Sequence, residues 1–175
     1  GNTLVGYATE EELNKSLVEG DLFVLQEFRA KVEEEMQLVS MAYETFKYVQ
    51  LNQSEDMVSF KKAKQGLKER LVALNDLLNR HMYGGINIPY EQWLTSHQPF
   101  HWLAEFYQII HGNGGFDVII GNPPYVTFTD VSLKYNVRQY STYNTKNLFA
   151  LCGERFTSLV CNNASIGYII PLSGM

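Results

Sequence analysis

Apolar residues recur every three or four positions through much of the first half of the chain, and this period predicts amphipathic helices. One stripe extends from about residue 22 to 51, and a second extends from 57 to 83, just before a strong stop at Gly84-Gly85. Residues 52–55 have the composition of a loop. Because this connection is short, the two helices are expected to form an antiparallel hairpin.

A shorter helix is expected from about residue 10 to 19, since Thr9 and Glu12 have the spacing of a capping box. Beyond the hairpin the period is lost. Residues 84–115 are rich in large aromatic side chains and contain two prolines, which predicts a packed irregular connection with one short strand or helix near 101–110. Three histidines lie in this connection, but their spacing is not that of a metal site, so no metal is predicted.

The second half contains a short β-branched run, Phe116–Gly121, that ends at Asn122-Pro123-Pro124-Tyr125. This composition predicts a buried strand that stops at a rigid turn. A polar, tyrosine-rich loop follows, then a helix at about 147–156, a break at Asn162-Asn163, and a second strand at 166–170. A strand–helix–strand unit is a right-handed crossover, so the two strands are expected to be parallel neighbours.

The composition of the 175 residues, 45% hydrophobic and 19% charged, is that of a globular protein. No apolar run approaches the roughly 18 residues that span a bilayer, and the start has no signal-peptide pattern. We therefore expect a cytoplasmic location and no membrane partner. The net charge of −5 argues against this segment as the main contact to nucleic acid. Cys152 and Cys161 fit no disulfide pattern, and both are expected to be buried thiols.

The turn at 122–125 carries the most specific chemistry. Ligands of open α/β sheets bind at the carboxyl ends of parallel strands, where this turn is expected. Two consecutive prolines remove two backbone N–H donors, so acceptors remain: the side-chain oxygen of Asn122 and the carbonyls of Asn122 and Pro123. Tyr125 adds a flat face. Such a site suits a planar group whose NH₂ has two hydrogens to donate.

An exocyclic amine or a side-chain amide is a poor nucleophile because its lone pair is delocalised. Two acceptors that hold its hydrogens favour a pyramidal nitrogen and stabilise the charge that develops during attack. Stacking on an aromatic ring, worth about 1–3 kcal/mol per base, offsets part of the cost of extruding a base from a duplex. A simple strand-ending turn is the alternative interpretation of these four residues.

The string from Phe116 to Val126 resembles the catalytic motif of amino-group DNA methyltransferases, which methylate the exocyclic nitrogen of adenine. Residues 147–156 and 167–171 are similar to the next helix and strand of these enzymes. Residues 99–106 resemble the segment before the motif in type IIG restriction–modification enzymes, and residues 1–6 resemble a short motif of the same group. The helical hairpin has the place of an insertion before the motif.

This resemblance implies S-adenosylmethionine as methyl donor, Asn122 and Pro123 as acceptors for the amino group, and Tyr125 as the stacking ring. It also implies that Leu148 and Phe149 lie near the adenine ring of the donor. The family's glycine-rich donor-binding loop and its recognition domain have no match in the chain. We therefore expect a fragment that is inactive alone and acts on double-stranded DNA in a full-length parent, with the remaining methyltransferase and target-recognition domains.

The expected architecture is an α/β fold with part of a Rossmann-like methyltransferase sheet, preceded by a long antiparallel helical hairpin. Its parts are an N-terminal segment with a short helix (1–20), the hairpin (21–83), the aromatic-rich connection (84–115) and a partial catalytic domain (116–175).

Lys134, Tyr135 and Arg138, in the loop after the motif, are candidates for DNA contact, although an ordinary surface loop explains them equally well. Two other functions stay open. One is a methyltransferase that acts on a protein glutamine or an RNA base. The other is a helical interaction module that carries a degenerate methyltransferase remnant.

Overall fold

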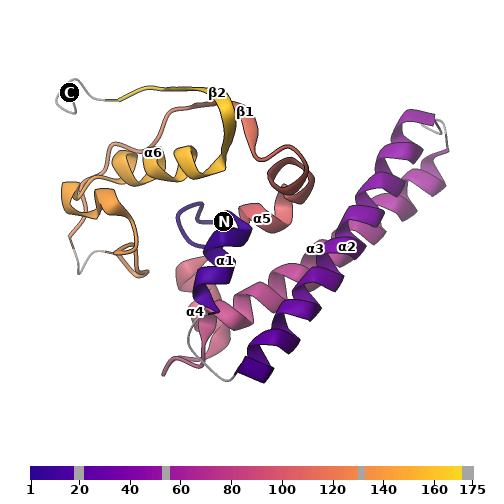
Figure 1. Cartoon of the computed structure of the whole chain (residues 1–175), viewed down its shortest axis with the longest axis horizontal. Coiled ribbons are helices and arrows are strands. Elements are labelled where there is room, and N and C mark those ends of the chain that lie inside the picture. The colour runs from indigo at the N-terminus through magenta and orange to yellow at the C-terminus, as the bar shows by residue number, and fades with distance from the viewer. Residues whose placement is uncertain (18–21, 53–55, 130–132, 171–175) are drawn as a thin grey trace. The chain divides into compact units, whose positions relative to one another are not determined.

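The computed structural model describes residues 1–17, 22–52, 56–129 and 133–170 (Figure 1). The chain divides into two compact units, Gly1–Leu13 with Gly85–Met175, and Asn14–Gly84. Within the described ranges, no helix is long and apolar enough to cross a membrane. The same residues contain no group of three or more His, Cys, Asp or Glu side chains that could hold a metal ion.

The predicted hairpin is confirmed. Helices α2 (Leu22–Asn52) and α3 (Met57–Tyr83) lie side by side (Figure 1). Their antiparallel course follows from two ring pairs: Phe28 stacks on His81 at 4.3 Å between centroids, and Phe46 meets Phe60 at 5.4 Å. Gly84 ends α3 in the left-handed conformation, with φ of 57°, as the sequence predicts. Most of the predicted loop, residues 53–55, lies outside the described residues.

Helix α1 (Glu10–Ser16) begins where the capping box predicts. The Thr9 hydroxyl accepts a hydrogen bond from the Glu12 amide at 3.3 Å, and the Glu12 carboxylate reaches back to the Ala8 amide at 2.9 Å. The last two residues of the predicted helix, 18 and 19, are outside the described residues.

The connection at 85–115 holds more helix than predicted. It contains α4 (Tyr90–His97), α5 (Trp102–Glu105) and the π-helix η1 (Gln108–Gly112), so the prediction of a single short element near 101–110 is wrong. Helix α4 has one fully buried residue, Trp93, whose ring stacks on its neighbours one turn away in both directions. A single buried position gives too short an apolar period to reveal the helix in the sequence.

The predicted crossover is confirmed in its main feature. Strands β1 (Phe116–Gly121) and β2 (Val160–Tyr168) pair in parallel, and α6 (Leu148–Leu159) lies between them in sequence (Figure 1). The predicted break at 162–163 is wrong, because β2 begins directly after the helix. The two asparagines instead lie in a bulge of β2.

The bulge is visible in the register of the two strands. Phe116 pairs with Val160, but Val118 pairs with Ser165, so β2 has three more residues than β1 over this interval. Asn163 has φ of 67°, a left-handed conformation that asparagine tolerates better than most residues.

The prediction that the first strand is buried is wrong for this chain. Val118 and Ile120 are 57% and 84% exposed. The opposite face of the sheet is covered by α6, where Phe156 packs edge-on against Tyr168 at 5.8 Å. One helix covers one face of a two-stranded sheet, and alternate residues of β1 point to the other face. Of the two predicted buried thiols, only Cys152 is buried.

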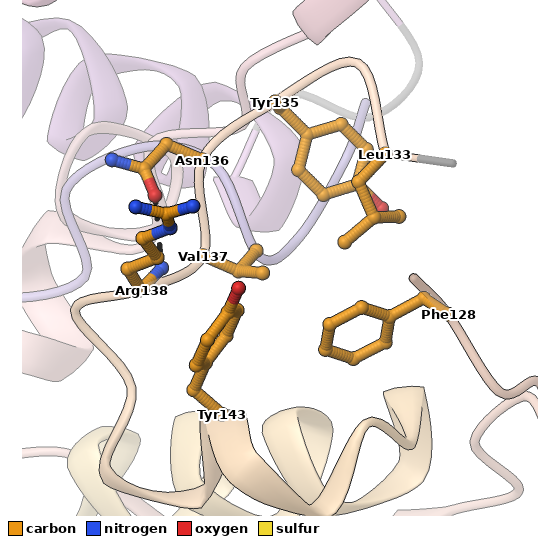
Figure 2. A pocket seen from close by; sticks show the side chains of 7 residues that line it. All are labelled: Phe128, Leu133, Tyr135, Asn136, Val137, Arg138 and Tyr143. Atoms are coloured by element: carbon orange, nitrogen blue, oxygen red, sulfur yellow. Dashed lines mark hydrogen bonds between the residues drawn. The ribbon is translucent and has the colours of Figure 1, made fainter. Parts of the chain in front are cut away.

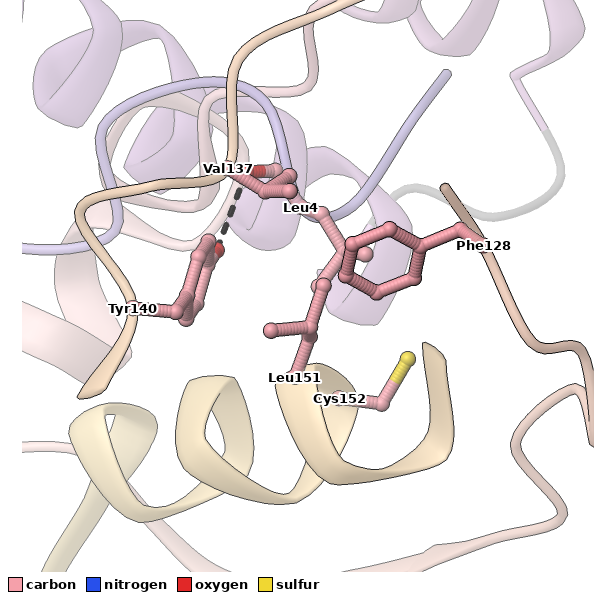
Figure 3. Close-up of a cluster of buried hydrophobic side chains, with 6 residues drawn as sticks. All are labelled: Leu4, Phe128, Val137, Tyr140, Leu151 and Cys152. Atoms are coloured by element: carbon pink, nitrogen blue, oxygen red, sulfur yellow. Dashed lines mark hydrogen bonds between the residues drawn. The ribbon is translucent and has the colours of Figure 1, made fainter. Parts of the chain in front are cut away.

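The N-terminal segment is built into the core of its unit. It lies beside residues 98–103, where the Phe100 amide donates to the Val5 carbonyl at 2.7 Å. The Leu4 side chain faces Leu151 on α6 (Figure 3). The Tyr140 hydroxyl donates to the Leu4 carbonyl at 2.9 Å, and this buried bond fixes the loop after the motif against the N-terminal segment.

Candidate active site

The turn at Asn122–Tyr125 follows the carboxyl end of β1, as predicted. The Ile169 amide, one residue past β2, donates to the Gly121 carbonyl at 3.2 Å, so the carboxyl ends of both strands are held together. Pro123 is buried, whereas Asn122 and Tyr125 are exposed. The turn is therefore anchored by a proline and presents its amide and its ring to solvent.

Asn122 and Tyr125 are in direct contact. The Tyr125 hydroxyl lies 2.8 Å from Asn122 Oδ1 and 3.0 Å from the Ile169 carbonyl oxygen. A phenol has one hydrogen, so these two acceptors share it. The sequence did not indicate Ile169, although the rule that parallel strands end at one edge could have placed the residue after β2 beside the turn.

The chemistry of the turn is dominated by acceptors. An amide oxygen has two lone pairs, and the Tyr125 hydroxyl needs only one of those on Asn122 Oδ1. Pro123 and Pro124 have carbonyls but no N–H. The turn can therefore accept hydrogens from an incoming amine while an aromatic ring lies next to the acceptor.

The start of α6 is joined to the segment after the motif. The Leu148 amide donates to the Val126 carbonyl at 2.9 Å, and the Phe128 amide donates to the Lys146 carbonyl at 2.8 Å. Leu148 and Phe149, the two residues that the resemblance assigns to the donor, are half-buried in the first turn of this helix. The structure thus brings the first turn of α6 next to the residues that follow the motif.

The three candidates for DNA contact are not equivalent. Tyr135 and Arg138 line a common pocket of about 260 Å³, whereas Lys134 is exposed and is not among the residues that line it. We call this the loop pocket. Residues 130–132 of the same loop lie outside the described residues.

Aromatic and aliphatic side chains form most of the loop pocket (Figure 2). Phe128 and Val137 are buried, whereas Leu133, Tyr135 and Tyr143 are half-buried. Phe128 and Tyr143 lie in different elements and were not predicted. Their ring centroids are 6.0 Å apart, so the two rings contact each other at the pocket (Figure 2).

The Glu154 carboxylate on α6 fixes the end of the loop that follows the motif, at residues 141 and 142. Glu154 accepts four hydrogen bonds of 2.8–3.0 Å from the backbone amides and hydroxyls of Ser141 and Thr142, which begin the 3₁₀-helix η2 (Ser141–Thr145). Burial alone raises the pKa of Glu154, but these hydrogen bonds outweigh it and hold the pKa below its ordinary value. The carboxylate therefore stays charged and fixes the element that carries Tyr143.

A buried arginine connects α6 to the N-terminal segment. Arg155 is 3% exposed; its guanidinium donates to Glu12 at 2.6 Å and to the Gly6 carbonyl at 3.4 Å, and it lies over the Tyr140 ring at 5.3 Å. Its Nε has no hydrogen-bond partner among the described residues. Periodicity places Arg155 on the apolar side of α6, but only the fold brings Glu12 to it.

The structure therefore has a strand–helix–strand crossover whose first strand ends at an acceptor-rich turn with an aromatic ring, the arrangement that the sequence predicts for a planar amine. The chain belongs to the Eco57I restriction-modification methylase family, whose model matches residues 22–175. This confirms the predicted resemblance to restriction-modification methyltransferases.

A Methanocaldococcus jannaschii protein named as a type II restriction enzyme and methyltransferase is 37% identical over 76 residues. The aligned part is 43% of this chain and spans 6% of that protein. No solved structure matches the chain.

Proposed function

We propose that this chain forms the amine-orienting half of a DNA methyltransferase that methylates the exocyclic amino group of adenine with S-adenosylmethionine. The contact between Asn122 and Tyr125 at the end of β1 is the observation that carries the proposal. It places a hydrogen-bond acceptor and a stacking surface side by side. Membership of a restriction-modification methylase family supports DNA as the substrate.

In the proposed reaction, S-adenosylmethionine supplies an electrophilic methyl group on a sulfonium centre. The adenine nitrogen would receive this methyl group, with the donor's neutral thioether as leaving group and one amino proton released to solvent or a base. Asn122 Oδ1 and the Pro123 carbonyl accept the two amino hydrogens and stabilise the positive charge on nitrogen. Tyr125 stacks on the extruded base and holds its plane.

The Tyr125 hydroxyl has a second role in this proposal. It donates to one lone pair of Asn122 Oδ1 and thereby keeps the oxygen, rather than the amide NH₂, at the site. The second lone pair remains for the amino hydrogen of the base. The Ile169 carbonyl is an alternative acceptor for the phenol, so the ring stays in place when the base arrives.

The residues present fit part of the methyl donor's site. Phe149 offers a half-buried ring in the first turn of α6, one residue after the backbone bond between Leu148 and Val126. The glycine-rich donor loop of the family has no counterpart in the sequence. We expect isothermal calorimetry on this chain alone to detect no micromolar binding of S-adenosylmethionine, and such binding would show that the donor site is more complete than proposed.

Substitution of Asn122 tests the proposed function. In the complete protein that contains this segment, Asn122→Ala should lower methyl transfer to duplex DNA by about 100-fold or more, because one acceptor of the transition-state charge is lost. DNA affinity should change little. Asn113→Ala is the matched control, since Asn113 is also exposed but precedes the amino end of β1.

The substrate is tested with the same enzyme and labelled donor on three acceptors: duplex DNA, RNA and protein. Label in N6-methyladenine of DNA is expected. Label in glutamine or in RNA would favour the other methyltransferase function, and near-normal activity of Asn122→Ala would contradict the catalytic role of the turn.

A second candidate function, protein interaction through the hairpin, is favoured by its exposed apolar side chains. Phe23 and Val58 are 83% and 77% exposed, and several further large apolar side chains on α2 and α3 are more than half exposed. These further residues are Leu22, Val24, Met41, Tyr48, Leu51, Met57 and Val72. We expect Phe23→Ser with Val58→Ser to abolish a specific protein complex without reducing methyl transfer. Loss of methyl transfer would instead connect these exposed positions, which lie at opposite ends of the hairpin, to catalysis.

A further inference from the structure

The loop pocket has a chemistry that the proposed catalytic turn does not use. Three aromatic rings, those of Phe128, Tyr135 and Tyr143, contribute to its lining together with Val137 (Figure 2). Every nucleobase has an apolar face, and aromatic side chains bind unstacked bases through that face without reading their sequence. A pocket built from rings is therefore suited to one flat heterocycle.

The volume of the pocket limits the size of the ligand. Its volume of about 260 Å³ is slightly below the roughly 300–1,000 Å³ of sites that enclose a drug-sized molecule. This volume is large enough for a single base and small for a nucleoside with a long tail.

Two cationic side chains lie beside the pocket. Arg138 is exposed at the side of the pocket, and the Lys146 ammonium lies 3.6 Å from the centroid of the Tyr143 ring and 5.6 Å from that of Phe128. Arginine and lysine contact phosphate groups in nucleic-acid complexes. The Asn136 side-chain oxygen accepts from the Arg138 amide at 3.0 Å, which leaves the Asn136 NH₂ as the polar group that can donate to a base edge.

The pocket is within short reach of the catalytic turn. Phe128 is three residues after Tyr125, so their Cα atoms are separated by at most about 11 Å even if the chain between them is fully extended. Successive bases along one strand of a duplex are about 3.4 Å apart along the axis, and extrusion lengthens that spacing. A nucleotide adjacent to the target adenine can therefore span the two sites.

The pocket is also held in shape before any ligand binds. Tyr143 lies on η2, which the four hydrogen bonds to Glu154 fix to α6, and Phe128 is tied to residue 146 through the backbone. Rings that are ordered in advance lose less entropy on binding than rings on a loose loop.

We propose that the loop pocket binds a second unstacked base, the neighbour of the target adenine on the same strand, with its phosphate near Arg138 and Lys146. This inference rests on the proposed function, because it requires a DNA strand at the catalytic turn. In this proposal, Tyr135 and Arg138 contact the same nucleotide instead of making separate contacts to the DNA backbone.

The experiment is a cycle that combines removal of the base with removal of a ring. Duplexes carry the enzyme's own site, located beforehand by mapping methylated adenines, with or without an abasic nucleotide beside the target. Because an abasic neighbour also saves the cost of extruding that base, the ring removal is compared on the two duplexes. Tyr143→Leu, which keeps apolar volume without a flat face, should weaken binding of the intact duplex by about 5- to 150-fold, the range that stacking of one base supplies. On the abasic duplex, which has no neighbouring base to stack, the same variant should weaken binding by about twofold or less.

Two further variants keep the result interpretable. Tyr135→Leu removes a second ring of the pocket and should give the same coupling even if Tyr143→Leu fails to fold. Tyr48→Leu, which replaces an exposed tyrosine on α2, is the matched control and should bind both duplexes as wild type does. Equal losses of affinity on the intact and the abasic duplex for both pocket variants would overturn the proposal, as would no loss on the intact duplex.

Binding, rather than methylation, is the measured quantity, so the test separates this inference from the proposed function. If the pocket variants have no selective effect on binding but Asn122 is essential for methyl transfer, the methyltransferase proposal remains in place. If Asn122 is dispensable, no target adenine is bound at the turn, and the pocket has no neighbouring base to bind.

Discussion

Two regions of the unit that carries the motif differ in how completely their side chains are buried. The tied region, formed by residues 1–13, residues 98–103 and α6, buries His101 and Arg155 almost completely and bonds both to partners far away in sequence. The open edge, formed by β1, the turn at 122–125 and Ile169, leaves Ile120 84% exposed. The N-terminal segment is thus better packed than the strand that leads into the motif.

This difference separates stability from chemistry. Buried, bonded polar groups are expensive to disturb, so substitutions in the tied region should reduce the free energy of unfolding. Groups of the open edge contact solvent, so substitutions there should change function with little effect on folding. The four predictions below test this separation, from the largest expected effect to the smallest.

The largest effect is expected at Gly6. Its φ of 124° is rarely adopted by other residues, and an added Cβ would lie 2.3 Å from the Phe100 carbonyl oxygen. Gly6→Ala must therefore displace backbone, and we expect a loss of about 4 kcal/mol or more in urea unfolding. Gly66→Ala is the control, because nothing lies within 4 Å of its Cβ in the middle of α3; it should stabilise the chain by about 0.5–1 kcal/mol. Equal effects would contradict the close packing of the N-terminal segment.

The two members of the Glu12–Arg155 ion pair should differ in how much stability is lost when each is replaced. Glu12→Gln leaves a charged guanidinium that is 3% exposed, whereas Arg155→Met leaves a carboxylate that is 36% exposed and can be hydrated. We expect Glu12→Gln to cost about 3 kcal/mol and Arg155→Met clearly less, measured by denaturant unfolding. Glu27→Gln, which breaks an exposed pair with Lys31, should cause no measurable change. A larger cost for Arg155→Met would show that packing of the arginine stem outweighs its charge.

His101 should make stability depend on pH. It is fully buried, its Nδ1 accepts a hydrogen bond from the Tyr7 amide at 3.0 Å, and burial lowers its pKa to about 4 from 6.5. Between these values the unfolded chain binds the proton and the folded chain does not, so stability falls as the pH falls from about 6.5 towards about 4. At about 1.4 kcal/mol per pKa unit, the full loss is about 3 kcal/mol.

Thermal unfolding of wild type and His101→Asn across this pH range measures the contribution of the histidine. The variant should be less stable at pH 7 but should lose less stability on acidification. A parallel pH dependence in both proteins would assign the effect to other groups.

Local patterns in the sequence predicted the elements whose signal in the sequence is local. The stripes of α2 and α3, the capping box of α1 and the motif at the end of β1 all depend on residues within one or two turns. The loop pocket was not predicted, because its rings come from separate parts of the loop and from η2.

The interactions that could not be predicted join distant residues. Glu12 and Arg155 are 143 positions apart, and Tyr125 and Ile169 are 44 apart. An arginine on the apolar side of a helix gives no sign of whether it reaches solvent or a partner until the fold is known. The exposure of Val118 has a similar origin, because a β-branched run predicts a strand but not how many of its faces are covered.

The smallest expected effect separates the two regions most directly, because the same substitution is made in both. Tyr140→Phe removes a buried hydroxyl that donates to the Leu4 carbonyl and should cost about 1–2 kcal/mol of stability, with no change in kcat. Tyr125→Phe removes an exposed hydroxyl that holds Asn122 Oδ1, so stability should be unchanged. The stacking face survives, so KM for DNA should stay within about twofold, while kcat falls by about tenfold as the amide loses its fixed orientation. If kcat is unchanged, the ring alone acts and the hydroxyl has no positioning role; if both variants lose stability equally, the open edge is as tightly bonded as the core.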